Sequence, residues 1–218
     1  MPKPANASQD LTHGSWLLEE CQPLLILVER HDSAIYWRTV DGRGKQRLNL
    51  AELGDGCPAL TPATGLSLCE AASVCLARRH ESGVTLHVTG DHQETYETHW
   101  PVISEQMRRT HHDEQMATER GAYGVAILLV KRASELTVVL QSRKGTGFDY
   151  WLGTDDQLFQ NAARLEVSGV LQAKDGSAVR RRAKRKERQT SVSDEMGLPA
   201  VVVVVEFGQP AAQYSVRK

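Results

Sequence analysis

The sequence predicts an α/β protein, α+β overall, on three observations. Val201 to Val205 is an unbroken run of valines, which is typical of a central strand that is covered on both faces. Short apolar or alternating segments between polar turn residues recur along the chain and predict further strands. Two longer stretches, at 66–79 and 113–131, are predicted to be helices. Residues 113–207 are therefore expected to form an αβββαβ core, preceded by a small α+β module.

The N-terminal elements are predicted from apolar runs and the turn signals between them. Residues 1–20 are polar and rich in proline, alanine and asparagine, which predicts a flexible tail. The turn residues His31-Asp32-Ser33 separate two apolar runs and predict a hairpin. Thr64 and Gly83 are a suitable cap and stop for a helix between them. The elements expected are strands at 24–28 and 34–37, a helix at 66–79, and strands at 84–88 and 95–100.

A domain boundary is predicted near Pro101, because proline removes a backbone donor and biases the preceding residue away from helix. The expected division is a tail at 1–20, an α+β module at 21–105 and a second domain at 106–218. The elements expected in the second domain are a helix at 113–131, strands at 136–142, 148–152 and 163–170, a basic helix at 178–190 and a strand at 200–207.

Composition favours a cytoplasmic protein. The chain has 218 residues and a formal net charge of −1, so overall basicity does not indicate a nucleic-acid binder. Its four cysteines form no CxxC pair and are expected to be buried thiols in a reducing compartment. No run approaches the ~18 apolar residues of a membrane helix, and no signal-peptide core follows Met1. We therefore expect a cytoplasmic location and no contact with a membrane.

Two acidic residues lie in apolar, strand-like surroundings. Asp149 follows Gly147-Phe148, and Glu166 stands between Leu165 and Val167. Neighbouring strands can hold both carboxylates on one side of a sheet, and Glu119 could approach from the helix at 113–131. Mg²⁺, or Mn²⁺ in its place, takes oxygen ligands and keeps several waters, so that two carboxylates suffice. Asp149 and Glu166 are thus candidate metal ligands, although a solvent-facing strand acid, a turn residue and a helix-surface glutamate are the alternative interpretations.

The order of elements and the positions of these acids resemble the PD-(D/E)XK nuclease superfamily, the restriction-endonuclease-like proteins. In that family an aspartate opens the second strand and Glu-x-Lys lies on the third, matched here by Asp149 and Glu166-Val167-Ser168. A helix acid near the site is matched by Glu119, and a glutamine that RecB-type members have on the following helix is matched by Gln189. The resemblance covers the C-terminal half of the chain. It implies a metal-dependent phosphodiesterase that acts on DNA or RNA, in bacterial defence or DNA repair.

Ser168 departs from the family pattern, because it stands where the motif has lysine. A lysine would orient the nucleophile and neutralise negative charge that develops during phosphoryl transfer. Serine offers a hydroxyl group and no charge. We expect Lys144, five residues before Asp149, to replace it, or alternatively Lys184 or Lys186 from the following helix.

The helix expected at 178–190 is strongly basic. Residues 180–188 include seven cations and one acid, which exceeds ordinary solubility needs and predicts contact with phosphates. DNA is the expected partner in preference to RNA. A solvated helix face and an acidic protein partner are the alternatives. The seven residues are Arg180, Arg181, Arg182, Lys184, Arg185, Lys186 and Arg188.

A second function from another class fits the same features. Ser168 favours a catalytically inactive nuclease-fold subunit that binds nucleic acid or scaffolds a larger complex. Residues 21–105 would then be the surface for protein partners, and a homodimer or a hetero-complex is left open. The presence of Asp149, Glu166 and Glu119 together favours the enzyme, because three neighbouring acids repel one another without a cation.

Overall fold

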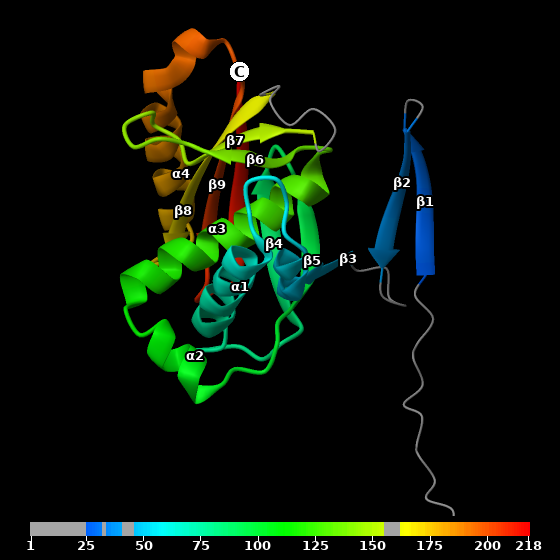
Figure 1. The fold of residues 1–218 in the computed structure, drawn as a ribbon, viewed down its shortest axis with the longest axis vertical. Helices are drawn as coiled ribbons and strands as arrows, with labels where there is room; N and C mark the ends of the chain where they lie inside the picture. Colours follow the sequence, from blue (N-terminus) through cyan, green and yellow to red (C-terminus); the bar gives the residue numbers. More distant parts are fainter. Residues whose placement is uncertain (1–24, 32–33, 41–45, 155–161) are drawn as a thin grey trace, which may run out of the picture.

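The computed structural model describes residues 25–31, 34–40, 46–154 and 162–218. These residues form a mixed α/β fold around a mixed sheet, as the sequence predicts (Figure 1). The predicted tail at 1–20 lies outside the described residues.

The sheet has ten strands within the described residues, in the order β1-β2-β3-β5-β4-β10-β9-β8-β7-β6. The β1–β2 hairpin joins β3 through one pair, Val40 with Gln46. Neighbours are parallel at β3–β5, β4–β10 and β8–β9 and antiparallel elsewhere. The strands are β1 (Leu25–His31), β2 (Ala34–Val40), β3 (Gln46–Asn49), β4 (Val84–Gly90), β5 (Glu94–His99), β6 (Thr137–Gln141), β7 (Tyr150–Gly153), β8 (Ala163–Val170), β9 (Ala200–Glu206) and β10 (Ala211–Arg217).

Capping residues fix where the helices begin. Helix α1 begins four residues before the predicted start, because Thr61 caps it and proline occupies the first turn. Asp113 caps α3 by accepting a 2.8 Å hydrogen bond from the backbone N–H of Met116. The helices are α1 (Pro62–Leu76), α2 (Glu105–Thr110), α3 (Glu114–Ala133) and α4 (Ala178–Gln189), with 3₁₀ segments η1 (Leu50–Asp55) and η2 (Thr190–Met196).

Helices cover both faces of the sheet at β8 and β9. Successive strand residues point to opposite faces, and Leu165 and Val167 enter the core beneath α3, whereas Glu166 and Ser168 bond to side chains of α4. Helices α1 and α3 therefore form a layer on one face and α4 lies on the other (Figure 1). All residues of β9 are buried, which confirms the prediction of a central strand covered on both sides.

The predicted module at 21–105 and the domain at 106–218 share one sheet and one core. Strand β10, which was not predicted, pairs with β9 on one side and with β4 on the other. Helices α1 and α3 pack so closely that a Cβ atom on Gly121 would lie 2.9 Å from the Cα atom of Ala72. The core cluster accordingly includes Tyr96 from β5 together with Val203 from β9.

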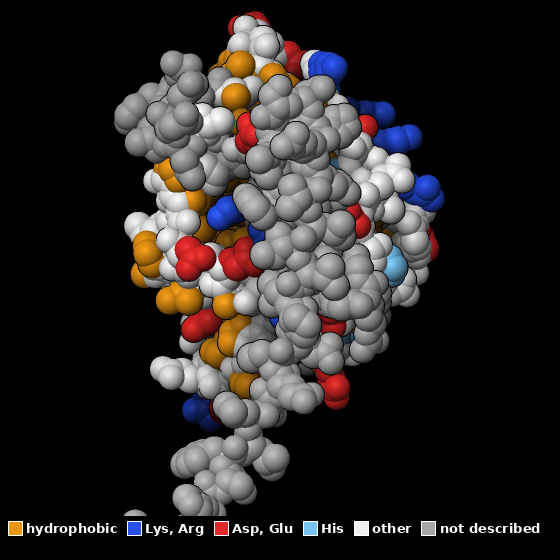
Figure 2. Space-filling model, turned by 90° about the vertical axis from the view of Figure 1, so that its right-hand side faces the viewer, with side chains coloured by type: hydrophobic (Ala, Val, Ile, Leu, Met, Phe, Trp, Pro, Cys, Tyr) orange, Lys and Arg blue, Asp and Glu red, His pale blue; other side chains and the backbone are white. Residues whose placement is uncertain are grey.

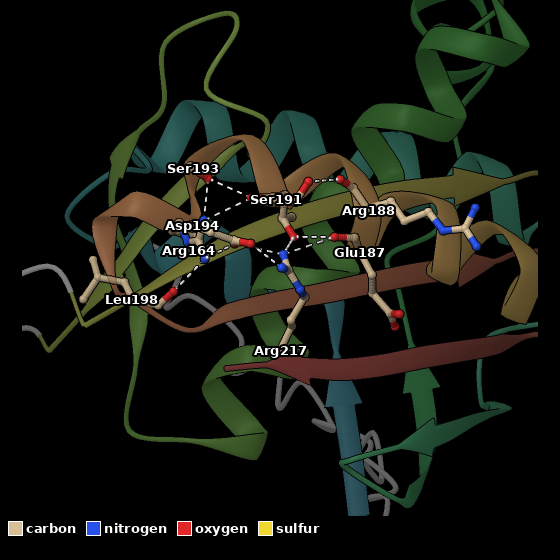
Figure 3. Close-up of polar contacts among 9 residues, drawn as sticks. Arg164, Glu187, Arg188, Ser191, Ser193, Asp194, Leu198 and Arg217 are labelled. Carbon is tan, nitrogen blue, oxygen red and sulfur yellow. Dashed lines mark hydrogen bonds and ion pairs between the residues drawn. The ribbon is translucent and has the colours of Figure 1, made fainter.

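A buried arginine links β8 to η2. Arg164 is 2% exposed and donates to the carbonyl oxygens of Thr190 at 3.1 Å and Leu198 at 2.6 Å (Figure 3). It also donates to Ser193 Oγ at 2.5 Å and lies 3.4 Å from Asp194 Oδ1. The Asp194 carboxylate is bound a second time, by Arg217 of β10 (Figure 3). The network thus ties β8, η2 and β10 together.

Candidate active site

The β6–β7 loop positions Asp149. The backbone N–H of Ser142 donates to the carbonyl oxygen of Asp149, and the N–H of Asp149 donates to that of Leu165, both at 2.8 Å. Gly147 has φ +82°, and a Cβ atom there would lie 2.7 Å from the carbonyl oxygen of Gln189. The loop therefore turns tightly against the end of α4, and only glycine suits this position.

Both oxygens of the Asp149 carboxylate are held. Oδ2 accepts a 2.8 Å hydrogen bond from the backbone N–H of Val167, and Oδ1 lies 3.1 Å from the hydroxyl of Tyr123. That hydroxyl also lies 3.3 Å from Glu119 Oε1, and its single proton can be donated to one carboxylate at a time. Burial raises the pKa of Asp149, while these hydrogen bonds oppose the rise.

Glu166 is the most deeply buried acid of the site, with 1% of its surface exposed. Its Oε1 lies 2.6 Å from Lys186 Nζ, and its Oε2 is buried without a hydrogen-bond partner in the described part of the chain. Burial, together with the nearby charge of Asp149, raises the pKa of Glu166 to about 7, against the lowering effect of Lys186. An unpartnered buried carboxylate oxygen is costly unless a proton or a cation reaches it.

Lys186 is the lysine that reaches the carboxylates. Besides Glu166, its ammonium group contacts Gln189 Oε1 at 3.1 Å. It points inward because it lies one turn from Ala183, the buried residue of α4. Lys144 lies exposed on the β6–β7 loop, and no hydrogen bond or ion pair of its side chain occurs among the described residues.

Ser168 is also paired with a cation from α4. Its buried Oγ accepts a 2.6 Å hydrogen bond from Arg182 Nε. Ser168 is thus covered by a guanidinium group, and Lys186, one helical turn after Arg182, pairs with Glu166.

A pocket of about 340 Å³ opens beside the two carboxylates. Its wall combines the acids with polar and cationic groups from α3, the β6–β7 loop and α4. Among the residues that line it are Tyr123, Arg143, Lys144, Asp149, Glu166 and Gln189. Five of these six were in the predicted site or next to it. Tyr123 was not, although its position four residues after Glu119 places the two on one face of α3.

The site contains a pair of acids that fits a hard cation by type. Glu119 is exposed and touches the pair only through Tyr123. Among the described residues, no group of three or more His, Cys, Asp or Glu side chains is arranged to hold a metal ion. Asp149 and the unpartnered Oε2 of Glu166 supply carboxylate oxygens at the wall of an open pocket, and Mg²⁺ is commonly held by one or two carboxylates with waters completing its shell.

The seven cations of α4 divide into two groups. Three have partners within the protein: Arg181 binds Asp175, Arg182 binds Ser168 and Lys186 binds Glu166. The other four are exposed, and no hydrogen bond or ion pair of their side chains occurs in the described ranges. They are Arg180, Lys184, Arg185 and Arg188.

Seven cations are concentrated on one helix, α4. On the face shown in Figure 2, basic, acidic and hydrophobic side chains are mixed, in keeping with a net charge of −1. Helix α4 lies at the opposite side of the molecule (left in Figure 1). No helix of the described residues has the length and apolar character needed to cross a membrane.

Comparison of the chain with models of protein families, with curated proteins and with solved structures finds no match.

Proposed function

We propose that the protein is a metal-dependent phosphodiesterase that acts on nucleic acid, with a restriction-endonuclease-like core formed by α3, β6, β7, β8, α4 and β9. The proposal rests on one observation: Lys186 Nζ lies 2.6 Å from Oε1 of Glu166, which lines an open pocket together with Asp149. Two carboxylates and one ammonium group on neighbouring elements are the charges that the chemistry requires.

Each residue has a role that its position supports. Asp149 and Glu166 would hold Mg²⁺ or Mn²⁺, and Tyr123 would orient the Asp149 carboxylate. When bound, the metal polarises a phosphoryl oxygen and lowers the pKa of a coordinated water. Lys186 would stabilise negative charge on the phosphoryl group, in place of the lysine that Ser168 replaces. Lys144, at the mouth of the pocket, would attract the substrate.

The substrate would be bound through its phosphates. Exposed Arg185 lies one helical turn from Gln189, which lines the pocket, and is therefore placed to contact a phosphate of a bound strand. Contacts of this kind recognise the backbone and not the sequence. DNA is the preferred substrate in this proposal, with RNA as the alternative, and a role in bacterial defence or DNA repair in the cytoplasm would suit the activity.

The test is cleavage of end-labelled single- and double-stranded DNA and RNA with Mg²⁺ or Mn²⁺ by wild type, Asp149→Asn and Glu166→Gln. Both variants should lose cleavage, while Glu195→Gln, which alters an exposed acid outside the pocket, should retain it. Cleavage that is equal in all four proteins would reveal a contaminating nuclease and defeat the proposal.

A non-catalytic nucleic-acid-binding or scaffolding subunit is the second candidate. Two observations favour it: serine occupies the motif position, and the described residues offer two, not three, clustered acids for a metal. Protein partners would then dock through residues 21–105. Binding of nucleic acid with no cleavage under either metal would support this candidate.

A further inference from the structure

A second pocket, of about 330 Å³, lies along α4 near its N-terminal half. Four cations line it: Lys174, Arg181, Arg182 and Arg185. Asp175 is the one acid in its lining. The active-site roles proposed above do not account for this pocket.

The charges of this pocket do not balance. The Asp175 carboxylate is already bound by Arg181, at 3.0 Å, and by Ser177. Among the described residues, no hydrogen bond or ion pair of the Lys174 or Arg185 side chains occurs. Arg182 is bonded through Nε alone, so its two terminal nitrogens have no partner there. Three positive charges therefore surround the pocket without an acid to offset them.

The fixed position and available N–H groups of Arg182 suit it to bind an oxyanion. Its Nε–H is fixed on Ser168 Oγ at 2.6 Å, which holds the guanidinium plane while the terminal N–H groups stay available. Burial lowers the pKa of this half-buried guanidinium, and the nearby Arg185 lowers it further, so an anion would relieve both effects. A guanidinium group binds phosphate through two parallel hydrogen bonds, which a fixed plane favours.

The second pocket and the active site lie on the same flank of α4. Arg182 and Arg185 line the second pocket, and Gln189 lines the active site. Residues spaced three, four and seven apart share a helix face. The rise of about 1.5 Å per residue puts roughly 6 to 10 Å between these positions along the axis. Phosphates of one strand of a duplex follow one another at about 3.4 Å along its axis, so this separation corresponds to about two to three nucleotides.

We infer that the pocket formed by Lys174, Arg182 and Arg185 is a second phosphate site, which binds a backbone phosphate of the same strand whose other phosphodiester enters the active site. The identity of the ligand as nucleic acid rests on the proposed function. The strand then follows the flank of α4 that faces β8, and the flank with Arg180 and Lys184 stays outside the complex.

The test compares two pairs of substitutions that remove equal charge from opposite flanks of one helix. Arg182→Gln/Arg185→Gln alters the second pocket, and Arg180→Gln/Lys184→Gln, at two exposed residues that do not line it, is its matched control. Arg185→Gln alone is included because Arg185 is exposed and its loss need not disturb folding. Binding of a fluorescein-labelled single-stranded DNA dodecamer is measured by anisotropy over a range of salt concentrations, without divalent metal.

The first pair should bind the dodecamer about tenfold or more weakly, and its log–log salt slope should be shallower by about 0.7, because one phosphate contact is lost. Arg185→Gln should show about half of that change in slope. The matched pair should change affinity less and leave the slope nearly unaltered. Equal losses in the two pairs, or no dodecamer binding by wild type, would overturn the inference.

A small substrate separates this inference from the proposed function. Bis(p-nitrophenyl) phosphate has one phosphodiester and cannot span both pockets, so its hydrolysis should fall less in Arg182→Gln/Arg185→Gln than cleavage of DNA does. Flank-specific DNA binding without hydrolysis of any substrate would retain the second site and reject the phosphodiesterase. Hydrolysis of the substrates, together with equal losses of DNA binding in both pairs of substitutions, would support the phosphodiesterase and reject the second site.

Discussion

The ammonium group of Lys186 lies 2.6 Å from the carboxylate of Glu166, although one belongs to α4 and the other to β8. The contact is one step of a regular series. Alternate residues of β8 bond to every fourth residue along α4 and into η2: Ser168 to Arg182, Glu166 to Lys186, and Arg164 to the carbonyl of Thr190, the first residue of η2. Two strand residues rise about 6.6 Å and four helix residues about 6 Å, so the two repeats nearly match.

This series explains how a lysine of α4, Lys186, reaches Glu166 of β8. Helix α4 connects the parallel strands β8 and β9, so it must run back across the sheet, opposite in direction to both. Positions later on β8 therefore face positions earlier on α4. A lysine at 186 consequently meets Glu166, while position 168 on the strand is free to be serine.

Replacing Lys186 should abolish most of the proposed activity. Lys186→Met keeps the length of the side chain and removes the charge, and the loss of one such electrostatic stabiliser costs about 10²–10³-fold in kcat. The measurement is cleavage of labelled DNA at saturating Mg²⁺. Lys184→Met, which removes the same charge from the other flank, is the control for substrate attraction.

The pattern of losses decides which lysine acts. If Lys144→Met is as damaging to kcat as Lys186→Met, the β6–β7 loop also supplies a catalytic cation. If Lys144→Met raises KM and leaves kcat unchanged, the loop serves in binding. Full activity of Lys186→Met would contradict the role assigned to it.

Divalent metal should stabilise the folded protein, since the folded state alone brings Asp149 and Glu166 together. Thermal unfolding with and without Mg²⁺ or Mn²⁺ measures this, and a concentration of 100 times Kd adds about 2.7 kcal/mol. Asp149→Asn should abolish the increase in Tm, and Asp55→Asn, at an exposed acid, should preserve it. A metal-induced increase of the same size in Asp149→Asn would place the metal elsewhere.

Glu166 should make stability depend on pH. Its pKa rises from 4.5 to about 7 on folding, because burial disfavours the charged form. Between those values the folded protein holds a proton that the unfolded chain has released, so the free energy of unfolding falls as the pH rises from about 4.5 to about 7. At about 1.4 kcal/mol per pKa unit, the decrease is at most about 3 kcal/mol.

Urea unfolding over this pH range, without metal, measures the effect. Glu166→Gln cannot titrate and should flatten the decrease, whereas Glu195→Gln should follow wild type. Parallel curves for wild type and Glu166→Gln would show that Glu166 does not bind the proton.

Much of the C-terminal fold could be predicted because its helices and strands have clear signals in the local sequence. The predicted helix at 113–131 is α3 (Glu114–Ala133), and the predicted basic helix at 178–190 is α4 (Ala178–Gln189). The valine run forms β9, and its residues are buried on both faces of the sheet, as the sequence predicts. Strand β10 was not predicted. It forms a hairpin with the preceding strand β9, but its other partner, β4, is distant in sequence, and the pairing that joins the two halves of the sheet is therefore not visible locally.

The acidic residues of the site could be predicted from the sequence, and its cationic residues less well. Asp149 and Glu166 do lie together, as strand context indicates. The sequence favours Lys144 as the site's lysine because it is near Asp149 in the chain. Which cation of a helix reaches the site, however, depends on the helix face on which that residue lies. Ala183, the one small apolar residue inside the basic run, marks the buried face and could have identified Lys186.

Arg164 gives the strictest test of the packing around α4. It is 2% exposed, and its donors satisfy the Thr190 and Leu198 carbonyls and Ser193 Oγ. Arg164→Met fills much of the same space but removes the arginine from those acceptors and leaves Asp194 with Arg217 alone, which should cost about 3–5 kcal/mol of unfolding free energy. Arg217→Met removes the half-exposed partner of the same aspartate and should cost about 1 kcal/mol or less. Urea denaturation gives both values, and a cost for Arg164→Met no larger than that for Arg217→Met would show that the buried arginine does not fix η2 and the end of α4 against β8.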